Sequence, residues 1–330
     1  MSTEASATFA CFGSQCGVWA AGDGGRGNAA DAVALAERSL RSWHRRFTRF
    51  EPGSELSALN ADTRATVPAA PLMLRLVQAV RDAAQRSGGL VDATLLGELE
   101  ASGYRADLGR PLPLAVALRL APPRRPAGPN PASRWREISV DADAGVVRRP
   151  PGVRIDSGGI AKGLFGDVLA ELLAPHATFA VDCAGDVRVG GADGTPRPVQ
   201  VTSPFDGGVL HEWALADAGV ATSGIGRRSW LDERGRVAHH LLDPASGRPA
   251  YTGIVQATAI APTATEAEER SKLALLRGPA HAPAALPDGG LLVYDDGSHE
   301  LLPTHPPRAT VRSVTIPACA APSSPQPSWA

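Results

Sequence analysis

Two early segments of the chain repeat apolar residues with the period of a helix. Residues 29–47 and residues 71–86 carry apolar side chains three or four positions apart, with polar residues between them. This spacing gathers the apolar side chains on one face of a helix. Gly88 and Gly89 then provide a stop for the second segment. We therefore predict two amphipathic helices, which we expect to cover a sheet.

Further along the chain the period shortens to that of strands. Apolar residues alternate through residues 136–149 around a polar turn, which predicts a hairpin, and residues 153–156 are predicted to continue its sheet. Helices are expected over residues 159–173 and 263–278, and short strands at 179–181, 187–189 and 199–202. Because helices and strands mix without a regular βαβ repeat, the sequence predicts an α+β fold.

Proline marks the irregular parts of the chain. It is concentrated between residues 111 and 131, which predicts a loop or an insertion there. We take this segment as the best candidate for a boundary between two lobes of one domain over residues 1–319. Residues 320–330 combine prolines with serines and are expected to form a disordered tail.

Charge and composition exclude several classes of protein. The 330 residues contain 33 basic and 34 acidic side chains, so the net charge is -1 and nucleic acid is disfavoured as a partner. No segment approaches the roughly 18 apolar residues of a membrane span. Residues 1–10 lack the basic and apolar regions of a secretory signal. We therefore expect a cytoplasmic protein without a membrane span.

Cysteine and lysine are both scarce. The 4 cysteines are scattered, without the paired spacing of a zinc site or of a disulfide scaffold. Of the 33 basic residues, only Lys162 and Lys272 are lysines. Either these two escaped a general drift to arginine, or they mark places where a compact ammonium group is required.

The most unusual local sequence is Asp-Ser-Gly-Gly-Ile-Ala-Lys-Gly at residues 156–163. A predicted strand turns there through two glycines into a predicted helix, whose free N–H groups attract phosphate. Lys162 adds a positive charge to the same turn, although the Walker pattern is absent. Two interpretations stay open at this point: an anion site, or a tight turn that needs glycine for steric reasons.

Two further clusters have both a chemical and a structural interpretation. His239 and His240 precede Asp-Pro-Ala-Ser-Gly at 243–247, so a histidine could accept a proton with Asp243 to orient it. The same residues are also typical of an ordinary turn. Glu268 and Lys272 stand four residues apart in the last predicted helix. That spacing is typical of a surface ion pair, although a carboxylate there could also bind Mg²⁺.

Taken in order, these segments resemble the ApbE-type FAD:protein FMN transferase family. The likeness includes Ser-Glu-Leu-Ser-Ala-Leu-Asn at residues 54–60 and covers nearly the whole chain. Its other segments are residues 12–14, 47–50, 88–94, 156–163, 181–186, 221–224, 240–249 and 263–272. The resemblance implies an ApbE-like flavin transferase fold, with mixed sheets, helices and a cleft between two lobes in which FAD lies.

The resemblance also implies a reaction and a set of site residues. FMN passes from FAD to a threonine hydroxyl of a target flavoprotein, with Mg²⁺ as cofactor, and AMP leaves. His240 is implied as the catalytic base, and Ala161 and Glu268 as the metal ligands. The residues implied in FAD binding are Phe12, Asn60, Asp92, Ala93, Thr94, Gly158, Lys162, Leu164, Leu242 and Lys272.

Two departures from the family pattern keep alternatives open. Glu268 and Lys272 stand where the family has Asp and Thr, and Ala184 replaces the first glycine of a Gly-Gly-Asp segment. An ammonium at position 272 would either pair with Glu268 or supply positive charge to the diphosphate. The alternative functions are a flavin-storage protein that binds FAD without catalysis, and a Mg²⁺-dependent pyrophosphatase that yields FMN and AMP.

Overall fold

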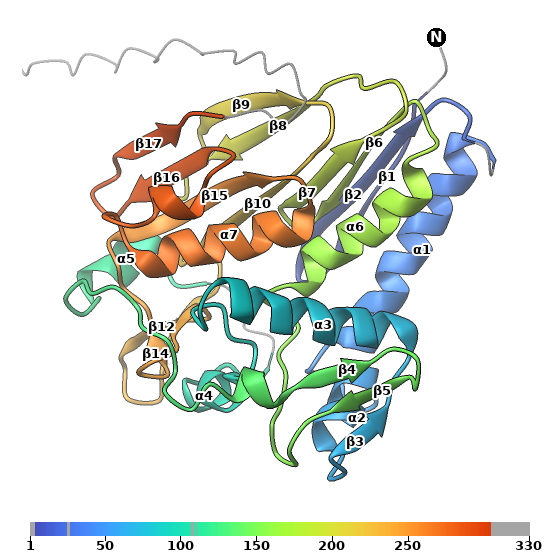
Figure 1. Cartoon of the computed structure of the whole chain (residues 1–330). Helices are drawn as coiled ribbons and strands as arrows, with labels where there is room; N and C mark the ends of the chain where they lie inside the picture. Colours follow the sequence, from blue (N-terminus) through green and yellow to red (C-terminus); the bar gives the residue numbers. More distant parts are fainter. Residues whose placement is uncertain (1–3, 25–26, 107–108, 110, 305–330) are drawn as a thin grey trace, which may run out of the picture.

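The main element of the fold is a long antiparallel sheet. The computed structural model describes residues 4–24, 27–106, 109 and 111–304, and within them eight strands form this sheet in the order β1-β2-β6-β7-β10-β15-β16-β17 (Figure 1). They are β1 (Ala5–Cys11), β2 (Ser14–Ala21), β6 (Thr178–Cys183), β7 (Asp186–Gly190), β10 (Ala218–Gly224), β15 (Ile254–Ala261), β16 (Gly290–Tyr294) and β17 (His299–Leu302). Every residue of β15 is buried, as expected of a strand covered on both faces.

Helices α1 (Ala29–Phe47), α6 (Ala161–Leu173) and α7 (Ala264–Arg277) pack on this sheet (Figure 1). Helix α1 contacts β1 and β2, α6 contacts β6 and β7, and α7 contacts β10 and β15. The first turns of α6 and α7 touch because Gly163 has no side chain. A Cβ atom there would lie 2.5 Å from the carbonyl oxygen of Ala264, which no real Cβ tolerates.

A second lobe is built around helix α3 (Pro71–Arg86) and a small sheet with the order β3-β5-β4 (Figure 1). Its strands are β3 (Thr66–Pro68), β4 (Ser139–Asp141) and β5 (Val146–Arg148), and its short helices are α2 (Glu55–Ala61) and α4 (Leu96–Ala101). Helix α3 packs on β4 and β5 with one side and on α6 and α7 with the other. Helix α3 therefore connects the second lobe to helices α6 and α7 of the main sheet.

The remaining elements are short. They are helix α5 (Leu114–Arg119), the hairpins β8 (Arg197–Thr202) with β9 (Val209–Leu215), β11 (Ser229–Leu231) with β12 (Val237–His239), and β13 (Leu242–Asp243) with β14 (Arg248–Pro249), and 3-10 turns at Arg134–Glu137 and Pro283–Ala285. In β9 the buried positions alternate with less buried ones, so the hairpin turns one face toward the core.

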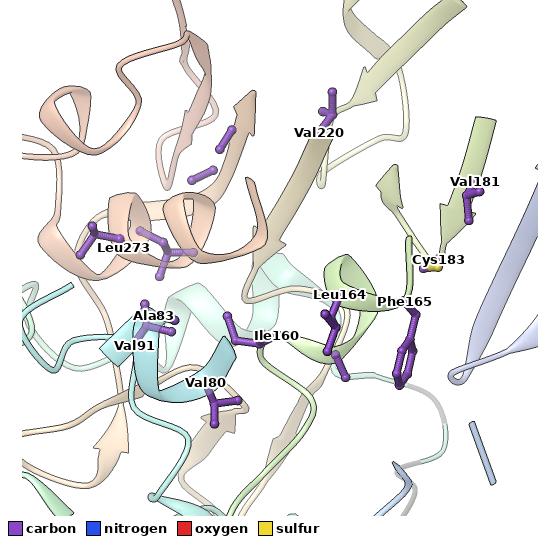
Figure 2. Packing of buried hydrophobic residues seen from close by; sticks show 14 of the residues in the cluster. Val80, Ala83, Val91, Ile160, Leu164, Phe165, Val181, Cys183, Val220 and Leu273 are labelled. Atoms are coloured by element: carbon purple, nitrogen blue, oxygen red, sulfur yellow. The ribbon is translucent and has the colours of Figure 1, made fainter. Parts of the chain in front are cut away.

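The core continues from the main sheet into the second lobe. Figure 2 shows Val80 and Ala83 of α3 near Ile160, at the start of α6, and Leu273 of α7. All four side chains are at least nine-tenths buried and belong to one apolar cluster. This cluster therefore packs the two lobes against each other in one close-packed core.

The structure confirms the α+β class and most of the predicted elements. The two amphipathic helices are α1 and α3, residue for residue. Each covers a sheet, but α1 lies on the main sheet and α3 on the small one. No helix among the described residues is long and apolar enough to cross a membrane. The predicted tail, 320–330, lies outside the described residues.

One prediction on local structure was wrong. Residues 153–156, all of them described, form no strand, because the backbone of Ile155 bonds to the amide of Asn60 and the N–H of Asp156 bonds to Ala93. The segment 111–131 is not only loop, since it contains α5, whose Leu114 and Ala117 are buried. Proline there permits a helix because it stands just before the first turn.

Candidate functional site

A pocket of about 630 Å³ opens between the helices on the main sheet and the second lobe. Its walls come from the end of α1, the loop after α3, the glycine-rich turn before α6, residues 240–242 and the middle of α7. This volume is in the range of pockets that bind small molecules. The pocket is therefore the candidate functional site.

Most of the predicted site residues meet in this pocket. Those that line it are Phe12, Asp92, Ala93, Gly158, Ala161, Lys162, His240, Leu242 and Lys272. Those that lie outside the lining are Asn60, Thr94, Leu164 and Glu268. Binding or catalytic roles for all of them stay predictions, but the structure gives the second group other contacts.

The residues outside the lining support those within it. Asn60 exchanges two hydrogen bonds of 2.8 Å with the backbone of Ile155, which holds the chain just before the glycine-rich turn. Thr94 donates its hydroxyl to Asp92 at 2.6 Å. Leu164 is buried in the core. These contacts position the pocket wall.

The glycine-rich turn offers few free backbone donors. The N–H groups of Ala161 and Leu164 bond to carbonyls within the turn, and that of Gly163 donates to Glu268 Oε2 at 2.8 Å. A helix start attracts an anion through its unpaired N–H groups. Since these three are used inside the protein, positive charge for an anionic ligand has to come largely from side chains.

The two lysines meet on one buried carboxylate. Lys162 and Lys272 place their ammonium nitrogens 3.3 Å and 3.1 Å from Glu268 Oε1. Lys162 also forms an ion pair with Asp186, which is buried. Glu268 has an exposed fraction of 0% and Lys272 of 9%, so the interpretation as a surface pair is wrong. The spacing was right, but α7 turns this face inward.

The charged groups of this cluster shift one another's pKa values. Burial alone would raise the pKa of Glu268, but the ammonium groups of Lys162 and Lys272 outweigh it and lower this pKa to about 2. Burial also raises the pKa of Asp186 to about 6, against the opposing effect of Lys162. Glu268 is therefore ionised at neutral pH and holds both lysines in place.

Two arginines of the pocket wall were not found from the sequence. Arg228 donates to the carbonyl of Phe12 at 3.0 Å and to the hydroxyl of Tyr104 at 3.1 Å. Arg49 lies 3.4 Å from Asp156 and stacks on the ring of Tyr104 at 4.5 Å. Arginine is so frequent in this chain that neither position stood out. For Arg49 the resemblance over residues 47–50 was the available signal.

His240 and His239 point into different surroundings. His240 lines the pocket, and its buried Nδ1 has no hydrogen-bond partner among the described residues. Burial, together with the positive charge of Arg228, holds the pKa of His240 well below its usual value, so the imidazole is neutral. His239 is buried at the end of β12 and packs edge-on against Tyr251, with ring centroids 4.8 Å apart.

Asp243 does not orient either histidine. Its carboxylate accepts hydrogen bonds from the N–H groups of Gly128 at 2.9 Å and Ala245 at 3.1 Å, and from the hydroxyl of Ser246 at 2.6 Å. The possible pairing of Asp243 with a catalytic histidine was therefore wrong. Here the structural interpretation of the Asp-Pro-Ala-Ser-Gly turn is confirmed.

Asp92 presents an unused acceptor. Its Oδ1 takes both hydrogen bonds from Thr94, whereas its Oδ2 is buried with no partner among the described residues. Burial raises the pKa of this carboxyl. A buried polar atom without a partner is costly. Asp92 is therefore suited to a ligand that donates a hydrogen bond.

The chain matches the family model described as the ApbE family over residues 1–292. The chain belongs to the ApbE family. It is 30% identical to the FAD:protein FMN transferase of Rhodobacter capsulatus over 280 residues, which are 82% of this chain and 52% of that protein. It is 31% identical to the FAD:protein FMN transferase of Treponema pallidum over 145 residues, 40% of each chain. The chain thus spans about half the length of the curated relatives it matches.

Solved structures of ApbE proteins share this fold. The crystal structure of the ApbE protein from Thermotoga maritima has a TM-score of 0.74, at 23% identity, and covers 91% of this chain and 97% of that one. The flavin transferase ApbE from Vibrio cholerae has a TM-score of 0.69, at 19% identity, and covers 92% of this chain and 98% of that one. The ApbE-like flavin transferase fold predicted from the sequence is therefore confirmed.

The magnesium site implied by the ApbE resemblance has an unsuitable set of donors. Both oxygens of Glu268 already accept hydrogen bonds, Oε1 from the ammonium of Lys272 and Oε2 from the N–H of Gly163, and Lys162 forms an ion pair with the same Oε1. Among the described residues, no three His, Cys, Asp or Glu side chains are grouped to hold a metal ion. Mg²⁺ requires oxygen ligands at about 2.0–2.1 Å. The residues around Ala161 and Glu268 therefore do not fit a divalent cation.

Proposed function

We propose that this chain is a FAD:protein FMN transferase. It binds FAD in the pocket and transfers FMN to a threonine hydroxyl of an acceptor flavoprotein, with release of AMP. The observation that carries the proposal is the meeting of a neutral histidine, His240, with Lys162, Lys272 and Arg228 in one pocket. The relatives named FAD:protein FMN transferase support the same choice.

The cationic side chains suit the diphosphate of FAD. As the bond between its two phosphoryl groups breaks, negative charge grows on the departing AMP and has to be stabilised. Lys162, Lys272 and Arg228 line the pocket. Fixed cations in a buried site stabilise such charge more strongly than water does, because they need no reorganisation.

His240 suits the proton transfer. A threonine hydroxyl is a weak nucleophile that needs a base. In the transfer, the hydroxyl oxygen forms a bond to the phosphorus of the FMN part, the proton goes to neutral His240, and the bond from phosphorus to the AMP oxygen breaks. Binding of an anionic diphosphate would raise the pKa of His240 from its low value, because a nearby negative charge favours the imidazolium.

We do not include in this proposal the magnesium ion that the resemblance implies, with Ala161 and Glu268 as ligands. The donor set found around Glu268 does not favour it. No step of the proposed reaction passes through Mg²⁺. The acceptor is proposed by class alone, as a flavoprotein with an accessible threonine.

The test is incubation of the full chain with FAD and a candidate acceptor. AMP release is measured by chromatography and covalent flavin on the acceptor by mass spectrometry. We expect equal amounts of both, and His240→Ala should lower the rate about 10²–10⁴-fold. AMP without flavin on the acceptor would identify a pyrophosphatase, and bound FAD without AMP a flavin-storage protein.

The matched control is His281→Ala, because His281 is exposed. It lies outside the pocket lining, and its loss should leave the rate unchanged. His239→Ala is unsuitable for this purpose. His239 has an exposed fraction of 1%, so removing its ring would leave a cavity in the core beside Tyr251. A normal rate in folded His240→Ala would exclude His240 as the base.

A further inference from the structure

Lys272 contacts Glu268, which the ApbE resemblance implies as a metal ligand. Its ammonium lies 3.1 Å from Glu268 Oε1 and also donates to the backbone carbonyl of the same residue at 3.4 Å. Lys162 approaches that same Oε1 at 3.3 Å. A divalent ion bound to this oxygen would need a lone pair that faces one of the two ammonium groups. It would therefore have to displace at least one of them.

The charges of the cluster balance without a metal ion. Two ammonium groups, those of Lys162 and Lys272, face two buried carboxylates, those of Asp186 and Glu268. Without an anionic ligand, adding a divalent cation would leave two uncompensated positive charges in a buried place. Uncompensated buried charge is strongly unfavourable. The cluster therefore needs no metal ion to balance its charges.

Lys272 connects the buried carboxylate to the pocket. It lines the pocket, whereas Glu268 lies behind it with no exposed surface. The lysine lies against the glycine-rich turn, with its Cε atom 3.5 Å from the position of a Cβ on Gly159. An ammonium has three donors, and the contacts with Glu268 use two of them. One donor is left for a pocket ligand.

We propose that Lys272 is the resident cation of this pocket and holds the phosphate groups of the ligand in place of a divalent metal ion. Lys162 and Arg228 complete the cationic wall. That the ligand is FAD rests on the proposed function, whereas the exclusion of a divalent ion from Glu268 does not. The choice of lysine in a chain with so many arginines fits this role, because a compact ammonium can take the place of a metal ion and a planar guanidinium cannot.

The first arm of the test uses the metal alone. The protein is stripped with EDTA, dialysed and titrated with MnCl₂, and free Mn²⁺ is followed by electron paramagnetic resonance. We expect no site with a Kd below about 1 mM in the unmodified protein, against the micromolar or tighter sites that well-matched ligands give. A single Mn²⁺ site of micromolar affinity in the unmodified protein would overturn the proposal.

The second arm measures FAD binding by fluorescence quenching, in EDTA and in excess Mg²⁺. We expect the two Kd values of the unmodified protein to agree within about twofold. Lys272→Met keeps the length of the side chain and removes its charge, and it should weaken FAD binding in EDTA by about ten- to a hundredfold. Mg²⁺-dependent binding in the unmodified protein, or normal binding by folded Lys272→Met, would overturn the proposal.

Arg270→Met is the matched control. Arg270 lies on the same helix but pairs with Asp288 and Glu266, away from the pocket. It removes one positive charge and should leave FAD binding unchanged. If FAD binds under neither condition, the proposed function falls, while the Mn²⁺ titration still decides whether Lys272 excludes a divalent ion.

Discussion

Helices α1 and α7 both pack on the main sheet, but they bury different kinds of side chain. The buried residues of α1 are all apolar, Val33 and Leu40 among them. Helix α7 buries Glu268, Ser271 and Lys272 together with its apolar residues. A helix that only supports the fold has no use for buried charge, which costs desolvation energy. The difference distinguishes a helix that stabilises the fold, α1, from a helix that places charged side chains at the pocket, α7.

The cost of the charges in α7 is offset only while they remain paired. Glu268 accepts hydrogen bonds from Lys272 and from the N–H of Gly163 and forms an ion pair with Lys162, so each charged group has a partner of opposite sign. Such an arrangement adds little net stability compared with apolar packing. It fixes two ammonium groups at a pocket wall, which apolar packing cannot do.

Glu268→Gln is the substitution with the largest expected effect on stability. It leaves the buried Lys272 and the half-buried Lys162 with only Asp186 as counter-charge. Breaking a buried pair by removing one partner costs about 3–5 kcal/mol. The free energy of unfolding from urea titration measures this loss, provided that the slope of the transition does not change.

Glu269→Gln is the control for that measurement. Glu269 is buried beside Glu268 in the sequence, but its partner, Arg86, has a side chain that is 48% exposed. After the substitution Arg86 can turn to solvent, so the loss should be clearly smaller. Equal losses in the two variants would show that the Glu268 cluster has no special coupling.

Leu40→Ala tests the other helix of this comparison, α1. Leu40 has an exposed fraction of 0% in the apolar face of α1. Its truncation should cost about 2–5 kcal/mol through lost burial and the cavity left behind. Because Leu40 does not line the pocket, FAD affinity of the folded fraction should be unchanged. If FAD affinity fell by more than the unfolded fraction explains, α1 would also contribute to binding, and the distinction between α1 and α7 would be wrong.

The same contrast explains how much of the fold could be predicted. Helices α1 and α3 matched their predicted bounds because helical period and capping act within a few residues of the chain. Residues 153–156 did not form the predicted strand because their partners, Asn60 and Ala93, come from distant segments. The period of a sequence contains no information about such partners.

The site was predictable where a motif marks it. The glycine-rich turn and His240 line the pocket, and resemblance alone had joined these distant segments. The burial of Glu268 could not be predicted, because an i, i+4 pair of opposite charges is found far more often on a helix surface. Arg228 had no signal at all. Its role comes from tertiary contacts with Phe12 and Tyr104.

The smallest expected effect belongs to the pair on α1 that has the same spacing as the pair on α7. Glu37 and Arg41 lie four residues apart at 2.8 Å, with side chains that are 31% and 44% exposed. Water solvates both charges when the pair is broken, so Glu37→Gln should cost only about 0.3–0.5 kcal/mol. Unfolding in low and high salt measures it, since an exposed pair is screened by salt. If Glu37→Gln cost as much as Glu268→Gln, burial would not be what separates the two helices, because the spacing and the chemical change are the same in both.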